Sequence, residues 1–238
     1  MPPSWPPNAC RRYRWTLHDG SARIASVRLK LTEIFHSLQG EADTVGIPTV
    51  FVRLTGCPLR CGFCDTAYAF SGGAWWQLDA ILERVQEFKC RYVCVTGGEP
   101  LAQPDCLQLL SRLADQGYRV SLETSGALPI EAVDARVVRV VDVKTPGSGE
   151  SHRNRYQQLA LLRPEEQIKF VLCDRADYDW SCATLQRLRL ADRCSVLFSP
   201  SHEQLPARQL ADWILADRLP VRLQIQLHKY LWGNEPGR

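Results

Sequence analysis

Three cysteines stand close together in a short polar loop, at positions 57, 61 and 64, with the spacing C-x3-C-x2-C. No fourth cysteine lies nearby, since the next one along the chain is Cys90. Four thiolates would complete a structural zinc site or a ferredoxin-type cluster. Three thiolates can instead hold three irons of a 4Fe-4S cube and leave the fourth iron open to a small molecule. The loop therefore predicts a reactive iron–sulfur centre with Cys57, Cys61 and Cys64 as its protein ligands.

A zinc site completed by more distant cysteines is the alternative, and it would make the chain a non-enzymatic zinc-binding interaction module. Cys90 and Cys94 are the first candidates for the missing half of such a site. However, Cys94 alternates with Val93 and Val95 as residues of a strand do, which separates it from Cys90. The iron and sulfide content of anaerobically purified protein decides between the two hypotheses.

The rest of the chain alternates between short β-branched runs and amphipathic stretches of helical length. The predicted strands are Thr49–Leu54, Tyr92–Thr96, Val120–Glu123, Val137–Asp142, Gln167–Leu172, Ser195–Ser199 and Leu223–Gln226. The predicted helices are Leu78–Phe88, Asp105–Asp115, Ala183–Arg189 and Pro206–Leu215. This alternation is typical of βα units and predicts an α/β fold, a partial (β/α) barrel of mainly parallel strands.

Polar or glycine-rich residues follow several of these strands directly. The cysteine loop follows Leu54, a Gly-Gly-Glu segment follows Thr96, and a Thr-Ser pair follows Glu123. The same pattern continues with Asp142–Lys144, Ser199–His202 and Gln226–Lys229. Because the carboxyl ends of parallel strands meet at one edge of a sheet, we expect these residues to form a single site.

Composition limits the class of protein. The chain has 238 residues, of which 45% are hydrophobic and 23% charged, with a net charge of +3. That length suffices for one core and is too short to argue for two domains. The basic residues are scattered, so nucleic acid is not an expected partner, and no apolar run is long enough to cross a membrane.

The beginning of the chain differs from the rest. Residues 1–28 are rich in proline and arginine and have no hydrophobic periodicity, which predicts a disordered or non-core extension before a single domain at 29–238. This segment does not resemble a secretory signal. Several of the ten cysteines lie in apolar runs rather than in a disulfide framework, so we expect the protein to work in a reducing cytoplasm.

The cysteine spacing resembles the cluster loop of the radical S-adenosylmethionine enzymes, in which the amino and carboxylate groups of that cosubstrate bind the open iron. The flanking segments resemble one family among them, the 7-carboxy-7-deazaguanine synthases, from about Leu31 to Trp232. The resemblance rests on Ser37–Glu41, Arg53, Cys64–Thr66, Thr96–Pro100 and Leu227–Lys229. The chain departs from the family pattern Leu-Gln-Gly-Glu-Gly at its last position, which is Ala42.

The resemblance implies a role for each set of site residues. The hydroxyl of Thr66 is implied to bind Mg²⁺ beside the cluster. Contacts with the cosubstrate are implied for Phe63, Gly98, Glu99, Ser125, Asp142, Val143, Lys144 and Ser199. Contacts with the substrate are implied for Leu38, Gln39, Gly40, Glu41, Arg53, Thr96 and His228. The residue types suit these roles, because glutamine and glutamate can bind the edge of an aminopyrimidinone and arginine can clamp a carboxylate with two parallel bonds.

The implied reaction is that of a carbon–nitrogen lyase of queuosine and 7-deazapurine biosynthesis. It converts 6-carboxy-5,6,7,8-tetrahydropterin into 7-carboxy-7-deazaguanine with loss of ammonia, through a 5′-deoxyadenosyl radical made from S-adenosylmethionine. The resemblance also implies a flavodoxin or ferredoxin as reductant and a homodimer. Glycyl-radical-enzyme activases share the cysteine loop and the Gly-Gly-Glu segment, and they are the enzymatic alternative. Their protein substrate would not require Gln39, Glu41, Arg53 and His228 to converge on a small acid.

Overall fold

A computed structural model describes residues 27–235 and 237, and its strands form a single nine-stranded sheet. The strands are β1 (Arg28–Leu38), β2 (Pro48–Leu54), β3 (Ala74–Gln77), β4 (Tyr92–Gly97), β5 (Arg119–Thr124), β6 (Val138–Val143), β7 (Gln167–Leu172), β8 (Ser195–Pro200) and β9 (Arg222–Leu223). They lie in the order β3-β1-β2-β4-β5-β6-β7-β8-β9. β1 pairs antiparallel with β2 and β3, and every pair from β2 to β9 is parallel.

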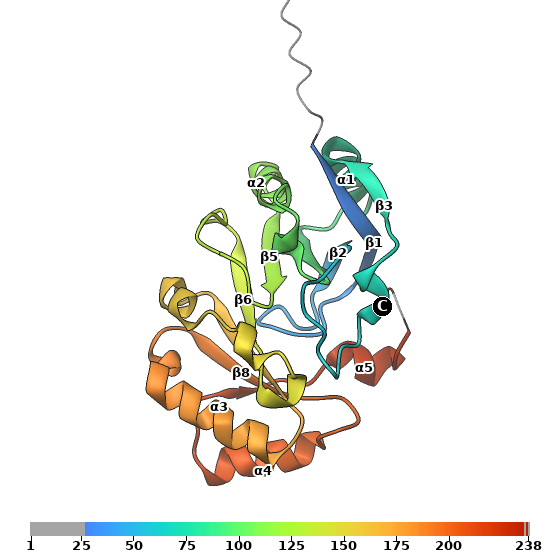
Figure 1. Ribbon diagram of the computed structural model, residues 1–238. Helices are drawn as coiled ribbons and strands as arrows, with labels where there is room; N and C mark the ends of the chain where they lie inside the picture. Colours follow the sequence, from blue (N-terminus) through green and yellow to red (C-terminus); the bar gives the residue numbers. More distant parts are fainter. Residues whose placement is uncertain (1–26, 236, 238) are drawn as a thin grey trace, which may run out of the picture.

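Four of the five α-helices in the described residues cover one side of this sheet. The five are α1 (Leu78–Glu87), α2 (Cys106–Asp115), α3 (Arg175–Leu188), α4 (Ala207–Ala216) and the short α5 (Leu227–Trp232). Figure 1 shows α1, α2, α3 and α4 around the outside of the curved arc of strands, with α5 apart from them. The sheet is open, because β3 and β9 stand at its two edges. The α/β class and the partial barrel of mainly parallel strands are thus confirmed.

Helix packing follows from the sequence period. α1 buries Leu78, Ile81, Leu82 and Val85, and this spacing places apolar side chains on one face of a helix. α2 does the same with Cys106, Leu109, Leu110 and Leu113. These faces join the β-branched residues of the strands in one continuous core.

One face of the central strand β7 packs in the core, and its other face lines a cavity. Ile168, Phe170 and Leu172 point into the core beneath the helices. Lys169 and Val171 alternate with them and line the cavity on the other face. The fold therefore encloses the cavity with the inner face of the arc.

Most predicted elements are present, with ends that shift by one or two residues. Two differ more. α3 begins at Arg175, eight residues before the predicted start, because Asp174 caps it by accepting a hydrogen bond from the Asp177 amide at 2.9 Å. β9 ends at Leu223 rather than at Gln226, and the Gln224 amide bonds to Phe198 O at 2.9 Å beyond the strand.

Three elements were not predicted: β1, β3 and α5. The predicted extension at 1–28 lies almost wholly outside the described residues, although Arg28 already belongs to β1. In the part of the chain that the structure describes, no helix combines the length and apolarity needed to cross a bilayer.

Candidate active site

A cavity of about 360 Å³ opens at the carboxyl ends of the parallel strands and collects most of the predicted site residues. Those that line it are Leu38, Gln39, Gly40, Glu41, Arg53, Cys57, Cys61, Phe63, Cys64, Thr66, Thr96, Gly98, Ser125, Asp142, Lys144 and His228. Glu99, Val143 and Ser199 do not line it. Val143 is buried in β6 as part of the hydrophobic core, and Ser199 is buried in β8, where it pairs in register with the cavity-lining Val171.

The three loop cysteines are free, half-buried thiols along the cavity wall. Burial raises the pKa of all three thiols, and the Lys144 ammonium offsets only part of this increase. In the described residues, no three His, Cys, Asp or Glu side chains are grouped as ligands of a single metal ion. A 4Fe-4S cluster differs from such a site, because each of its cysteine ligands binds a different iron.

Backbone contacts fix the cysteine loop. The Gly62 amide donates to Ser148 O at 3.0 Å, and the Arg60 amide donates to Glu150 Oε1 at 2.6 Å. On the opposite side, the Glu99 amide donates to Gly56 O at 2.8 Å. The loop is thus held by groups that follow other strands, namely the Ser148 carbonyl, the Glu150 carboxylate and the Glu99 amide.

The Gly-Gly-Glu segment packs tightly against this loop. A Cβ at Gly98 would lie 2.3 Å from Gly56 O and 2.8 Å from Cys57 Cβ, so only glycine fits there. Glu99 is fully buried, and its carboxylate accepts hydrogen bonds from Thr124 Oγ1 at 2.9 Å and from the Ser125 amide at 2.8 Å. This carboxylate therefore joins the ends of β4 and β5 from behind the cavity wall.

Asp142 and Lys144 form an ion pair at 3.2 Å on the inner face of the arc. Burial would lower the pKa of Lys144, but Asp142 and Cys61 raise it above its usual value. The second oxygen of the acid, Oδ1, is buried and has no hydrogen-bond partner among the described residues. An unsatisfied buried acceptor is costly unless a ligand supplies a donor, so this oxygen marks a binding position.

Arg53 is oriented by its neighbours on β1 and the loop. Its Nε donates to Glu33 Oε1 at 2.7 Å, and Tyr68 donates its hydroxyl to the same oxygen at 2.8 Å. Burial would lower the pKa of Arg53, but Tyr68 and Glu33 raise it. Burial and Glu33 together raise the pKa of Tyr68 to about 12. The guanidinium is therefore a fixed positive charge at the cavity wall.

An amide, a hydroxyl and a carboxylate meet nearby. Gln39 Nε2 donates to Glu123 Oε1 at 3.3 Å, and Thr96 Oγ1 donates to Glu123 Oε2 at 3.2 Å. Burial raises the pKa of Glu123, partly offset by Lys169. Glu123 thus shares a subsite with the predicted substrate residues rather than with the predicted cosubstrate residues.

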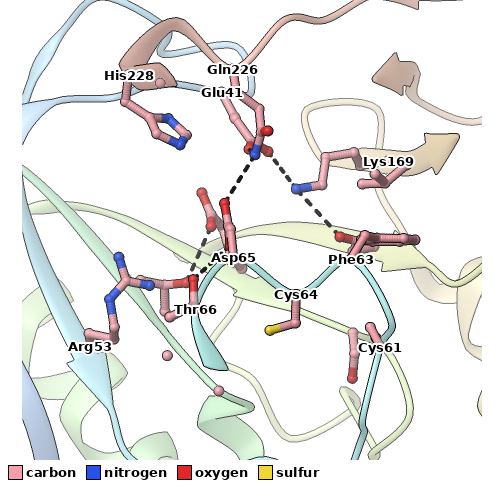
Figure 2. A pocket seen from close by; sticks show the side chains of 18 of the residues that line it. Glu41, Arg53, Cys61, Phe63, Cys64, Asp65, Thr66, Lys169, Gln226 and His228 are labelled. Carbon is pink, nitrogen blue, oxygen red and sulfur yellow. Dashed lines mark hydrogen bonds and ion pairs between the residues drawn. The ribbon is translucent and has the colours of Figure 1, made fainter. Parts of the chain in front are cut away.

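Glu41 lies between two partners from distant parts of the chain. Its Oε2 pairs with the Lys169 ammonium, and its Oε1 accepts from Gln226 Nε2 at 2.8 Å. His228 stands beside this group in Figure 2. Its ring excludes any side chain at Gly40, where a Cβ would lie 2.1 Å from Nδ1. Burial lowers the pKa of His228, which favours the neutral ring at neutral pH.

Thr66 and Asp65 follow the last cysteine. Thr66 donates its hydroxyl hydrogen to Asp65 Oδ1 at 2.8 Å, which leaves its oxygen lone pairs available to a cation. Burial raises the pKa of Asp65, but Thr66, Lys229 and His228 outweigh it and lower the value overall. Two oxygen groups next to the cysteine loop suit a hard cation such as Mg²⁺.

Comparison with known proteins assigns the family. The model of the Radical SAM superfamily matches residues 51–139. The protein named 7-carboxy-7-deazaguanine synthase from Chlorobaculum tepidum is 45% identical over 208 residues, which cover 86% of this chain and 94% of that protein. The chain belongs to the 7-carboxy-7-deazaguanine synthase family. Relatives of the same name from Koribacter versatilis and Thermoplasma acidophilum are 42% and 36% identical, and each match covers 87% of this chain and 98% or 99% of the relative.

Solved structures agree on the fold. The crystal structure of QueE from Escherichia coli matches with a TM-score of 0.69 at 24% identity, over 84% of this chain and 94% of that one. Streptococcus suis SuiB bound to precursor peptide SuiA matches with a TM-score of 0.53 at 15% identity, over 74% of this chain and 48% of that one. Neither the fold nor the family match favours an activase or a zinc-binding module.

The residues present fit the cofactors of a 7-carboxy-7-deazaguanine synthase, a radical S-adenosylmethionine enzyme. The half-buried thiols of Cys57, Cys61 and Cys64 offer the soft ligands of a 4Fe-4S cluster. The tight packing at Gly98 and the unpartnered Oδ1 of Asp142 suit a second ligand next to it. The packing at Gly98 and the unpartnered oxygen of Asp142 are properties of the chain itself.

The sequence did not single out Lys169 and Asp65, which both have charged partners in the cavity. Lys169 stands in the middle of an apolar strand, and an unexplained charge in such a strand was the signal that could have found it. Asp65 was noted only as a neighbour of Thr66, although it bonds to Thr66 and pairs with Lys229 at 3.5 Å.

Proposed function

We propose that the protein converts 6-carboxy-5,6,7,8-tetrahydropterin into 7-carboxy-7-deazaguanine and ammonia, as a lyase of 7-deazapurine and queuosine biosynthesis. The observation that carries this proposal is the cavity in which three cysteine thiols share one wall with Arg53, Glu41 and His228. The chain covers nearly the whole length of relatives that bear the name of this activity.

The substrate occupies the end of the cavity around Arg53. The guanidinium uses its Nε for Glu33 and keeps its terminal nitrogens for the substrate carboxylate. Glu41 and Gln39 bind the amide and amine edge of the pterin, while Leu38, Gly40, Thr96 and His228 complete the wall. Because Glu33, Lys169 and Gln226 already hold these side chains, they lie at the cavity wall before the substrate binds.

The cosubstrate occupies the end around Lys144. Lys144 pairs with its carboxylate, Asp142 Oδ1 accepts one of its hydroxyl or amino hydrogens, and the backbone at Gly98, which lines the cavity, binds its amino group. Phe63 and Ser125 contribute the remaining surface, Glu99 and Val143 support it from behind, and Ser199 lies buried beside Val171 of the cavity wall. When bound, the cluster and S-adenosylmethionine supply the radical that abstracts hydrogen from the substrate.

Thr66 binds Mg²⁺ together with substrate oxygens in this proposal. Thr66→Ala then leaves the iron content and cosubstrate cleavage intact but slows product formation, and added Mg²⁺ stimulates the variant much less than the parent. Thr66→Ser keeps the oxygen and retains part of the response. Activity titrations with Mg²⁺ on samples of equal iron content test this, and identical responses of parent and Thr66→Ala contradict it.

The surroundings of the reaction are part of the proposal. A flavodoxin or ferredoxin supplies the electron, the protein works as a homodimer, and the reaction takes place in the cytoplasm. The resemblance to the family is what supports these assignments.

The decisive experiment uses anaerobic, cluster-loaded protein with a reductant, S-adenosylmethionine, Mg²⁺ and the carboxypterin. We expect 7-carboxy-7-deazaguanine by mass spectrometry and ammonia in equal amount. Cleavage of S-adenosylmethionine without the deazaguanine, in protein with a full cluster, would show that the substrate is wrong.

A further inference from the structure

Lys169 links the two ends of the cavity. It lies in β7 beside Asp142 of β6, which is its register partner in the sheet. Its ammonium pairs with Glu41 Oε2 at the substrate end and with Asp142 Oδ2, at 3.4 Å, at the cosubstrate end. Glu41 follows β1 and is 128 positions away in the sequence, so this lysine joins segments that are otherwise remote.

The contacts continue in both directions from Lys169. Asp142 Oδ2 is shared with the Lys144 ammonium at 3.2 Å, and Glu41 Oε1 accepts from Gln226, which reaches Asp65 Oδ2 at 3.4 Å. Figure 2 shows the dashed contacts that lead from Asp65 through Gln226 to Lys169. One chain of alternating acceptors and donors therefore runs from the residue beside Thr66 to the base of the cosubstrate end.

A single ammonium divides its attraction between two carboxylates here. The side chain of Lys169 is only 11% exposed, so solvent screens these interactions little. Burial would lower the pKa of Lys169, but Glu41 and Asp142 raise it well above its usual value, so the charge is permanent at neutral pH. If Asp142 attracts the Lys169 ammonium more strongly, Lys169 therefore holds Glu41 less strongly, and the reverse.

We propose that Lys169 is a positioning residue that makes the binding of substrate and cosubstrate cooperative. The cooperativity is positive because Lys144 and Lys169 share Asp142 Oδ2. A cosubstrate carboxylate that engages Lys144 leaves this oxygen to Lys169, which moves toward Asp142 and loosens its hold on Glu41 Oε2. That oxygen can then accept hydrogen bonds from the pterin.

Thermodynamic linkage gives the size and symmetry of the effect. If the cosubstrate strengthens pterin binding by some factor, the pterin strengthens cosubstrate binding by the same factor. Coupling between sites in proteins commonly amounts to roughly 5- to 150-fold. This inference rests on the proposed function, because it assigns one ligand to Lys144 and the other to Glu41.

The test measures binding rather than turnover. The cluster-loaded enzyme is kept oxidised, so that no reaction occurs, and the dissociation constant of S-adenosylmethionine is measured by calorimetry with and without saturating carboxypterin and Mg²⁺. We expect at least about fivefold tighter binding with the pterin for the parent. Lys169→Met, which removes the charge and keeps the length, should bring this factor close to one. Lys169→Arg should preserve most of it.

The controls separate coupling from general damage. Lys30→Met changes a lysine of β1 that does not line the cavity, and it should keep the parent's factor. Iron content and circular dichroism establish that the variants are folded and loaded. A parent without coupling, or a Lys169→Met enzyme that retains the full factor, overturns the inference. A parent that binds no carboxypterin at all contradicts the proposed function instead.

Discussion

At the scale of residues, the site is a set of charges that hold one another before any ligand arrives. Glu33 holds Arg53, and Lys169 holds Glu41. A buried charge is tolerated when it is paired, and breaking one partner leaves the other uncompensated. Substitutions in this cavity should therefore act on the partner as well as on the ligand.

The cysteine loop gives the first prediction at this scale. Cys61→Ala should abolish formation of the 4Fe-4S cluster, because two thiolates cannot hold the cube, and Cys57→Ala and Cys64→Ala should do the same. Iron and sulfide analysis after anaerobic reconstitution measures the effect. Cys90→Ser is the matched control, since Cys90 does not line the cavity and its Sγ bonds to the backbone oxygens of Pro48 and Tyr92; this variant should keep the content near four irons per chain. Full iron content in Cys61→Ala would contradict the ligand assignment.

Arg53 gives the second. Arg53→Ala should weaken carboxypterin binding by about 2 kcal/mol or more, which is roughly 30-fold or more, because it removes the charge that pairs with the carboxylate. The affinity for S-adenosylmethionine alone should change little, since we propose that it binds to Lys144 and Asp142 at the other end. Calorimetry on the cluster-loaded, oxidised enzyme measures both constants. Equal losses for the two ligands would mean that Arg53 supports the cavity as a whole.

At the scale of elements, the sequence predicts the long parallel repeat and misses its edges. Runs such as Gln167–Leu172 are recognisable because burial on both faces demands apolar residues. β1 is more difficult, because its half-buried pattern mixes charged and apolar side chains beside the edge. β3 and α5 have only four and six residues, too few for a periodic pattern.

The residues of the candidate site that follow the central parallel strands were predictable, as those strands were. Motifs that follow the central strands converge as expected, because parallel strands end at one edge. Glu99 was expected at the ligand and lies behind the wall, where four neighbouring backbone and hydroxyl groups donate hydrogen bonds to its carboxylate. Hydrogen-bond partners of this kind depend on tertiary packing, which spacing along the chain does not encode.

The turn after β1 carries a prediction of its own. Ala42, which replaces the family's glycine, has a φ of 63°, in the left-handed region that costs an L-residue roughly 1–2 kcal/mol. Ala42→Gly should therefore stabilise the protein by about 0.5–1 kcal/mol, the remainder being offset by the greater freedom of glycine in the unfolded chain. Urea denaturation at neutral pH measures this. Ala80→Gly in α1, where the backbone is helical, should instead destabilise by about 1 kcal/mol. A destabilised Ala42→Gly would show that the methyl group packs too well to lose.

At the scale of the whole molecule, ligand binding and stability occupy opposite ends of the sheet. The cavity lies where the parallel strands end. Near their beginnings, Arg139 of β6 forms a two-bond ion pair with Glu166, its Nε and Nη2 lying 2.5 and 2.6 Å from the carboxylate oxygens. Arg139 also donates to Ile130 O and Leu161 O. This cluster therefore ties the connections around β6 to β7, away from the residues that face ligands.

Glu166→Gln should destabilise the fold without touching the site. The carboxylate is fully buried, and removing one partner of a buried ion pair costs about 3 kcal/mol. Burial raises the pKa of Glu166, but Arg139 and Arg163 outweigh it and lower the value in the folded protein. Its contribution is therefore complete above the unfolded pKa of roughly 4.3 and is lost as the pH falls toward the folded pKa.

Urea denaturation of cluster-free samples measures this effect. The difference in unfolding free energy between parent and Glu166→Gln should be constant from pH 7 to about pH 5 and should shrink below about pH 4.3. Glu165→Gln, at an exposed neighbour, should change stability by less than about 0.5 kcal/mol at every pH. A loss of less than about 0.5 kcal/mol for Glu166→Gln would show that the charge of Glu166 does not stabilise the fold.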